Sequence, residues 1–225
     1  MRALTVKMVL ELITHEGIVL ETYKDSVGVL TWGVGVTNAS GHNVDRYIRK
    51  PSTLYRALEV SIWLMENSYL PDVIEEFGED WLRMPENMKA AALSFHWNTG
   101  GIKRARWVEK FRAEGATAEV REAWDKGWRQ PEGRQQAELR LFFDGRWSHD
   151  GYATVYEVNS KMQPYVANKP RVFIEDLVKE IMGVGDAAPP PTKSNDDVIQ
   201  NEIKAIVADF ENHIRNLVRL AQHKE

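Results

Sequence analysis

The hydrophobic pattern changes period within the first 37 residues, and this change restricts most strongly what the chain can fold into. Apolar residues at positions 6, 9, 10 and 13 recur at the spacing of one helical face, which predicts a helix over about residues 3–15. Gly17 is a natural residue to follow that helix, so Glu16 is expected at its C-terminal end. From Tyr23 to Thr37, glycines punctuate short β-branched runs, which predicts a small hairpin-rich sheet.

Beyond this sheet the patterns are mainly helical. A helical block begins near Ser52, with Ser52 or Thr53 as its N-cap, and Pro71 either kinks or ends it. Further along, YATVYEV alternates and predicts a strand, whereas RVFIEDLVKEIMG predicts a helix. The other helical segments are expected at 86–98, where Gly100-Gly101 then breaks the chain, and at 104–114, 117–128 and 132–143.

A linker and a regular helix occupy the last part of the sequence. Residues 183–196 contain Pro, Gly and Ser and are typical of a linker. The helix that follows the linker contains three to four heptads, which are only marginally stable as an isolated helix. We therefore expect it to self-associate, to dock on a different partner, or to fold back or stay mobile. A wall-binding module is disfavoured, because the segment is short and carries no net positive charge. The heptad seam lies within 197–223, at Ile199, Ile203, Ile206, Phe210, His213, Leu217 and Leu220.

Composition argues against several classes of protein. The chain has no cysteine, which rules out disulfides, thiolate metal sites and thiol nucleophiles. A formal net charge of −4 gives no reason to expect nucleic acid or an anionic membrane as a partner. No apolar run approaches the roughly 18 residues of a membrane span, and the N-terminus lacks a signal-peptide cleavage site. The six histidines show no ligand spacing, so neither a metal nor another cofactor is expected.

Two carboxylates and a threonine near the N-terminus are candidates for catalysis. Eight residues separate Glu16 from Asp25, and five separate Asp25 from Thr31. If helix and sheet bring the two acids to opposite walls of a cleft, one can donate a proton while the other guides a water, as glycoside hydrolysis requires. The helix dipole disfavours a negative charge on Glu16, turn N–H groups favour ionised Asp25, and the Thr31 hydroxyl can hold a water. On spacing alone, a solvated helix end and an ordinary turn residue are the better interpretation.

Three ordered blocks of sequence give the carboxylate pair a context. The first is EG…L…YKD…G…TWGVG, which runs from Glu16 to Gly35. The second is ALSFHWNTGG, and the third is RQQAELRLFFDGRW. In order and content these blocks resemble the phage-type lysozymes, the endolysins of glycoside hydrolase family 24. The resemblance extends over residues 3–148.

The resemblance implies an α+β, mainly helical fold, lysozyme-like and two-lobed, with a small β-sheet lobe and a helical lobe around a cleft. A lysozyme-like catalytic domain is expected over 1–182, followed by the linker and the C-terminal helix. Within it we expect a small β lobe at about 17–50, a helical lobe at about 52–148 and an extension at 149–182. The extension is expected to cover the core or, as the weaker alternative, to add a sugar or peptide contact.

The resemblance also implies an activity, hydrolysis of the β-1,4 bond between N-acetylmuramic acid and N-acetylglucosamine in peptidoglycan, with inversion favoured. Carried over by position, Glu16 would be the general acid and Asp25 the base or electrostatic stabiliser. Thr31 would hold the water, and Arg134 matches the arginine that pairs with the acid.

Four further residues are expected to contact the sugar: Trp32, Gly35, Trp97 and Asn98. Ordinary helix packing is an equal alternative for Trp97 and Asn98. Trp32 and Val36 depart from the family pattern, and both could alter sugar contacts.

Bacterial peptidoglycan is the partner that the resemblance implies, in phage-induced lysis of the host cell. The protein would be made in the host cytoplasm without a signal peptide and would reach the wall after release through a pore made by a separate protein. A virion-associated or structural wall-binding protein on the same scaffold is the alternative. The presence of Glu16, Asp25 and Thr31 together favours the enzyme.

Overall fold

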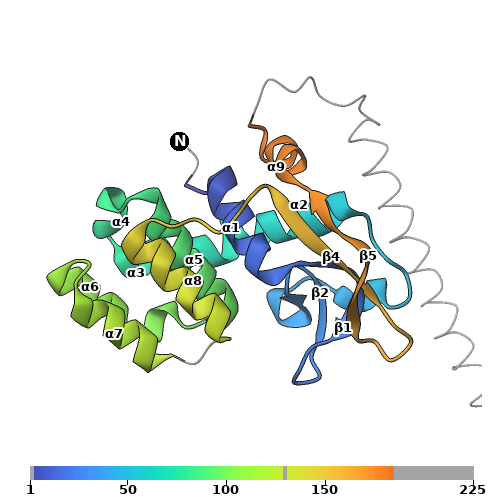
Figure 1. The fold of residues 1–225 in the computed structure, drawn as a ribbon, viewed down its shortest axis with the longest axis horizontal. Helices are drawn as coiled ribbons and strands as arrows, with labels where there is room; N and C mark the ends of the chain where they lie inside the picture. Colours follow the sequence, from blue (N-terminus) through green and yellow to red (C-terminus); the bar gives the residue numbers. More distant parts are fainter. Residues whose placement is uncertain (1–2, 129–130, 185–225) are drawn as a thin grey trace, which may run out of the picture. The chain divides into compact units, whose positions relative to one another are not determined.

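The computed structural model describes residues 3–128 and 131–184, which belong to one compact unit. The heptad helix expected over 197–223 and most of the expected linker lie outside these residues. The described part is mainly helical and carries one five-stranded sheet, so the predicted α+β class is confirmed (Figure 1). Within the described residues, no helix is both long enough and apolar enough to cross a membrane.

Helix α1, Val6–Glu16, forms where the apolar spacing predicts it. Thr5 caps its N-terminus, because its side-chain oxygen accepts a hydrogen bond from the N–H of Met8 at 3.3 Å. Gly17 follows the last turn with a φ of +71°, a conformation that favours glycine, and its N–H donates to the carbonyl of Ile13. The predicted end of the helix is therefore confirmed, and Glu16 occupies its last position.

The sheet is assembled from two distant parts of the sequence, in the order β3-β2-β1-β4-β5. Strands β1 (Ile18–Lys24), β2 (Leu30–Gly33) and β3 (Val36–Thr37) are the antiparallel meander expected from the glycine pattern. Strand β4 (Tyr152–Val158) pairs in parallel with β1, and β5 (Pro164–Phe173) pairs antiparallel with β4 (Figure 1). Residues of the expected extension thus lengthen the sheet beside β1.

One expected boundary in this region is wrong. The residues 171–173 were predicted as the start of a helix, but they belong to strand β5, and helix α9 covers only Glu175–Met182. The reason is cross-strand pairing, since Thr154 of β4 faces Arg171 and Ala153 faces Val172. Pairing with a neighbouring strand decides the state of short apolar segments that sequence periodicity leaves ambiguous.

Helix α2 (Leu54–Leu64) begins after Thr53, whose side chain caps it. Met65–Tyr69 continues it as a π-helical turn, η3, and α3 (Leu70–Phe77) follows directly. Pro71 therefore does not end the helical run, and the π-helical turn lies immediately before it. Two 3-10 turns, η1 (Asn38–Ser40) and η2 (Val44–Tyr47), connect β3 to α2.

The remaining helices pack around the apolar α5 (Glu86–Thr99), which ends at Gly100 as predicted. Trp107 and Trp124 stack with ring centroids 4.0 Å apart, and Phe95 and Phe142 meet them edge-on. These four rings are buried and hold the helical part together. The other elements of this part are α4 (Asp80–Arg83), η4 (Ile102–Arg104), α6 (Arg106–Glu114), α7 (Ala118–Gly127) and α8 (Glu132–Asp144).

Candidate active site

Glu16 is the first candidate acid, and the end of α1 places it where the helical part and the sheet meet. Its side chain keeps 20% of its surface exposed, and its Oε1 accepts a hydrogen bond from Nη1 of Arg134 on α8. Its other oxygen, Oε2, lies against the turn between β2 and β3, where a Cβ built on Gly35 would be 3.4 Å away. The carboxyl group is thus fixed at one oxygen and faces a glycine at the other.

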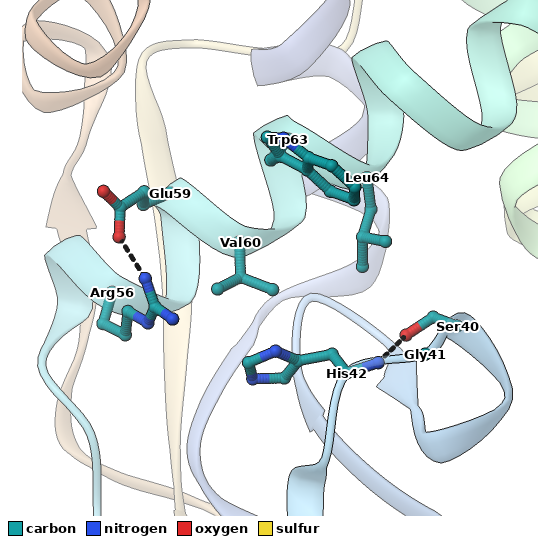
Figure 2. Close-up of a pocket in the computed structure, with 8 residues that line it drawn as sticks. All are labelled: Ser40, Gly41, His42, Arg56, Glu59, Val60, Trp63 and Leu64. Atoms are coloured by element: carbon teal, nitrogen blue, oxygen red, sulfur yellow. Dashed lines mark hydrogen bonds and ion pairs between the residues drawn. The ribbon is translucent and has the colours of Figure 1, made fainter. Parts of the chain in front are cut away.

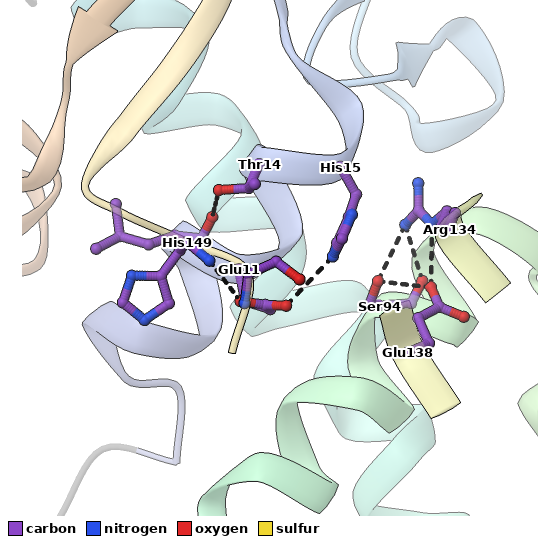
Figure 3. A network of polar contacts seen from close by, with 9 residues as sticks. Glu11, Thr14, His15, Ser94, Arg134, Glu138 and His149 are labelled. Carbon is purple, nitrogen blue, oxygen red and sulfur yellow. Dashed lines mark hydrogen bonds and ion pairs between the residues drawn. The ribbon is translucent and has the colours of Figure 1, made fainter. Parts of the chain in front are cut away.

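Arg134 is held by a buried network of its own (Figure 3). Its Nε donates to Oε1 of Glu138 at 3.0 Å, and its Nη2 donates to the carbonyl of Ser94 at 3.1 Å. The Ser94 hydroxyl donates to the same Glu138 oxygen at 2.7 Å. Burial disfavours the charged guanidinium, but Glu16 and Glu138 outweigh this and raise the pKa of Arg134. Arg134 therefore remains a fixed cation that orients Glu16.

Asp25 begins the turn between β1 and β2, and its carboxylate is held by that turn. Its Oδ1 accepts hydrogen bonds from the N–H groups of Val27 at 2.9 Å and Val29 at 2.8 Å. Thr31 lies in β2, and its hydroxyl donates to the carbonyl of Val29 at 3.1 Å. Since a hydroxyl oxygen also accepts, the Thr31 side chain can still bind a water or a sugar hydroxyl. One short hairpin therefore orients both side chains.

Tyr23 belongs to the same group of residues, although the motif does not include it as a candidate. Its Cα pairs with that of Thr31 across the β1–β2 ladder. Burial, followed by the charges of Glu16 and Asp25, raises the pKa of Tyr23 to about 12, so both carboxylates lie within electrostatic reach of its hydroxyl. The signal was available in part, because Tyr23 lies only two residues before Asp25, near the end of the strand that leads into the turn.

Trp97 and Gly35 form the contact between α5 and the sheet. The indole N–H of Trp97 donates to the carbonyl of Val34 at 3.1 Å, and the Trp97 ring lies 4.5 Å from that of Tyr69. Burial, together with the charge of Glu16, raises the pKa of the Tyr69 hydroxyl, which therefore also lies near the acid. Trp97 is only 9% exposed, so most of its surface packs against protein.

Trp32 lies in the core and not on a surface that a sugar could reach. It is fully buried, its indole N–H donates to the carbonyl of Leu20 and to Ser52, and it stacks on Tyr47 at 4.1 Å. The expected direct sugar contact of Trp32 is therefore corrected to a packing role. Val36, the other departure from the family pattern, is also buried. Asn98 is exposed at the end of α5.

A second carboxylate of α1, the buried Glu11, binds the segment that follows α8 (Figure 3). Glu11 accepts hydrogen bonds at Oε2 from the N–H groups of Ser148 and His149, at 2.8 and 3.0 Å, and its Oε1 lies 3.2 Å from Nε2 of His15. Burial raises the pKa of Glu11, but these partners outweigh it, so the net pKa is lowered. Glu11 thus ties the segment after α8 to the helix that carries Glu16.

The arrangement offers general acid–base chemistry. Two carboxylates from different elements share one neighbour, Tyr23, and a threonine hydroxyl lies on the same hairpin. Among the described residues, no group of three or more His, Asp or Glu side chains is placed to hold a metal ion.

Comparison with known proteins gives two kinds of match. The model of the phage lysozyme family matches residues 13–140. Among solved structures, a mutant of P22 lysozyme shares 20% sequence identity, with a TM-score of 0.50 over 63% of this chain and 99% of that one. An endolysin from Escherichia coli O157:H7 phage FAHEc1 shares 20% identity, with a TM-score of 0.48 over 64% of this chain and 96% of that one. No curated protein matches the chain.

Proposed function

Because this chain belongs to the phage lysozyme family, we propose that it is a muramidase, which hydrolyses the β-1,4 bond between N-acetylmuramic acid and N-acetylglucosamine in peptidoglycan. The observation that carries this proposal is geometric: Arg134 holds Glu16 at the end of α1, and Asp25 is held in the hairpin that follows. Glycoside hydrolysis typically uses two carboxyl groups that flank the bond to be cleaved.

Glu16 acts as the general acid and protonates the oxygen of the leaving sugar. The geometry that supports this role is the Arg134 hydrogen bond at Oε1, which leaves Oε2 to face the turn at Gly35. A proton donor must meet its acceptor at hydrogen-bond distance, and the Arg134 bond fixes the direction in which Oε2 points.

Asp25 acts from the other side of the sugar as a base or electrostatic stabiliser. Two backbone N–H groups bind its Oδ1, so we assign Oδ2 to the contact with water or with the developing positive charge on the sugar. Thr31 positions the water through its hydroxyl. We propose that the reaction inverts the anomeric centre, as the resemblance to the phage-type lysozymes favours, with a water held by Asp25 and Thr31 as the attacking group.

Arg134 supports this chemistry by positioning Glu16, and Gly35 leaves room for the Glu16 carboxyl group. Asn98, exposed at the end of α5, is proposed to contact the sugar. Trp97 contributes through its bond to Val34, which fixes the turn that contains Gly35. Trp32 is left out of the substrate-contacting set because it is fully buried.

The biological setting we propose is phage-induced lysis, with synthesis in the host cytoplasm and action on the wall after release through a separate pore protein. A virion-associated or purely wall-binding protein is the competing function. The buried Arg134 network that holds Glu16 supports the enzyme, since a wall-binding protein has no need for a carboxyl group held in this way.

The test is release of soluble fragments from purified peptidoglycan by the wild type, by Glu16→Gln and by Glu21→Gln. Glu21 is a matched control because it lies on β1, outside the proposed set. We expect clearing by the wild type and Glu21→Gln, and a loss of about 10²–10⁴-fold in Glu16→Gln, the usual contribution of a general acid. Equal clearing by all three would overturn the acid assignment, and no clearing by the wild type would favour the wall-binding alternative. Proton NMR of the first-formed anomer decides between inversion and retention.

A further inference from the structure

A pocket of about 470 Å³ lies between α2 and the loop around η1, and none of the proposed catalytic residues lines it. Its volume falls within the roughly 300–1,000 Å³ typical of small-molecule sites. Figure 2 shows its two sides, with side chains of α2 on one and the loop that carries His42 on the other. The lining residues are Ser40, Gly41, His42, Arg56, Glu59, Val60, Trp63 and Leu64.

The α2 side of the pocket presents an aromatic ring beside aliphatic groups. Trp63 is 59% exposed, whereas Val60 and Leu64 are buried and form an apolar floor. The spacing of three and four residues places Trp63 on the same part of the helix as Val60 and Glu59. Large exposed indole rings are uncommon on a folded protein, and tryptophan is among the residues that most often dominate binding energies.

The polar groups of the pocket are connected before any ligand binds. Arg56 forms an ion pair with Glu59 at 2.7 Å, and Glu59 and Tyr47 outweigh burial and raise the pKa of Arg56. The Tyr47 hydroxyl lies 3.2 Å from Nε2 of His42, whose ring stacks over Trp32 at 5.2 Å. Such a chain of contacts fixes donors and acceptors at the pocket wall, which lowers the ordering cost of binding.

The charges that line the pocket cancel. Arg56 and Glu59 neutralise each other. Burial, followed by the nearby charges of Arg56 and Arg46, lowers the pKa of His42, so its ring is neutral at neutral pH. A neutral pocket with paired polar groups selects against strongly anionic ligands, which need uncompensated cations.

We propose that this pocket is a second saccharide-binding site, which holds an uncharged pyranose unit of a glycan strand against Trp63. A pyranose has apolar C–H faces and a rim of hydroxyl groups, so one ring meets both the indole and the polar groups of His42, Arg56 and Glu59. The site would hold a stretch of polymer while another part of the strand is cleaved. The choice of peptidoglycan as the glycan rests on the proposed function, whereas the binding of a pyranose at Trp63 does not.

Binding is tested with chitotetraose, an uncharged oligosaccharide, by NMR of the isotope-labelled full chain. We expect saturable shifts of the Trp63 indole and the His42 ring. Trp63→Ala should weaken binding at this site about tenfold or more, Trp63→Phe should restore part of it, and Glu59→Gln should weaken it. Tyr165→Ala is the matched control, since Tyr165 is an aromatic residue 44% exposed on β5, and it should bind like the wild type. Shifts absent from Trp63 and His42, or equal affinity in Trp63→Ala, would refute the saccharide site.

Catalysis provides a second, separable measurement. On intact peptidoglycan, Trp63→Ala should raise KM about five- to tenfold with kcat unchanged, while hydrolysis of short soluble fragments stays at the wild-type rate. An unchanged KM on intact peptidoglycan would contradict the role in holding the strand. If the wild type hydrolyses nothing, the muramidase proposal fails, but the chitotetraose titration still decides whether Trp63 binds sugar.

Discussion

Nη1 of Arg134 donates a hydrogen bond to Oε1 of Glu16, 118 positions earlier in the chain. The same guanidinium binds the buried Glu138 through Nε, so one cation serves two carboxylates from different elements. The pair therefore joins α8 to the end of α1, and it couples the stability of the helical packing to the orientation of the proposed acid.

Replacement of Arg134 by glutamine should destabilise the protein strongly. The substitution leaves Glu138, which is fully buried, without its cation, and breaking a buried pair typically costs about 3–5 kcal/mol. Urea unfolding measures the loss. Arg121→Gln is the matched control, because its partner Asp144 and Arg121 itself are both more than one-third exposed, and such pairs contribute about 0–1 kcal/mol. Equal losses in the two variants would contradict the structural importance of the Arg134 network.

Tyr23 should make stability sensitive to alkaline pH. Its pKa is about 12 in the folded protein and about 10 in the unfolded chain, so the folded state holds the proton more tightly. The stabilisation is complete below pH 10 and is lost as the pH rises from 10 to 12. Between pH 10 and pH 12, the free energy of unfolding of the wild type should fall by about 2–3 kcal/mol more than that of Tyr23→Phe, as measured by urea unfolding.

The same experiment tests the proximity of Tyr23 to Glu16. Since the charge of Glu16 contributes to the raised pKa, the alkaline loss should be smaller in Glu16→Gln than in the wild type. A wild type and a Tyr23→Phe variant with parallel pH profiles would show that the hydroxyl of Tyr23 does not experience this environment.

Glu11 should make stability sensitive to acid. Its folded pKa lies below the ordinary glutamate value of 4.5, so its contribution is present above about pH 4.5 and is lost as the pH falls through the lower folded value. Glu11→Gln should lower the free energy of unfolding by about 1.5–3 kcal/mol at pH 7, the usual range for hydrogen bonds to a charged group. The loss should be smaller below about pH 4.

Hydrogen exchange locates this effect in the structure. The amides of Ser148 and His149 donate to Glu11, so both should exchange faster in Glu11→Gln. Glu114→Gln, at an exposed position on α6, is the control for stability, and its free energy of unfolding should stay within about 0.5 kcal/mol of the wild-type value. Unchanged exchange at both amides would show that Glu11 does not hold this segment.

Local patterns predicted the individual elements well. The helix that ends at Glu16 and the strand at 152–158 both follow from periodicity, because each depends on neighbours within its own segment. The parallel pairing of β1 with β4 could not be predicted in this way. It joins Ile18 to Val155, and nothing in either segment specifies the other as its partner.

Local sequence likewise predicted some residues of the candidate site and not others. Glu16, Asp25 and Thr31 were selected because they lie close together in sequence within a motif, whereas Tyr23 was overlooked as an ordinary strand residue. Trp32 shows the converse error, since its place between Thr31 and Gly33 suggested a sugar contact. Strand alternation points its ring to the other face, onto Tyr47.

Gly35 permits a test that separates backbone strain from crowding of the site. Its φ is +77°, and a Cβ there would lie 3.4 Å from Oε2 of Glu16 and 3.4 Å from Nε1 of Trp97. Gly115 is the matched control, because its φ is +76° and nothing lies within 4 Å of a Cβ added there. Both Gly→Ala variants should lose about 1–3 kcal/mol of stability, since an alanine is strained at a positive φ.

Only the substitution at Gly35 should also impair catalysis. The added methyl group would be in van der Waals contact with Oε2 of Glu16 and Nε1 of Trp97. It would occupy space beside the oxygen that must approach the leaving group to hydrogen-bond distance, so the rate should fall about tenfold or more. Urea unfolding and peptidoglycan clearing, measured on the same two preparations, give the stability and the rate. If Gly35→Ala and Gly115→Ala clear peptidoglycan equally well, the turn at Gly35 does not border the reacting groups, and the assignment of Oε2 of Glu16 as the proton-donating oxygen fails with it.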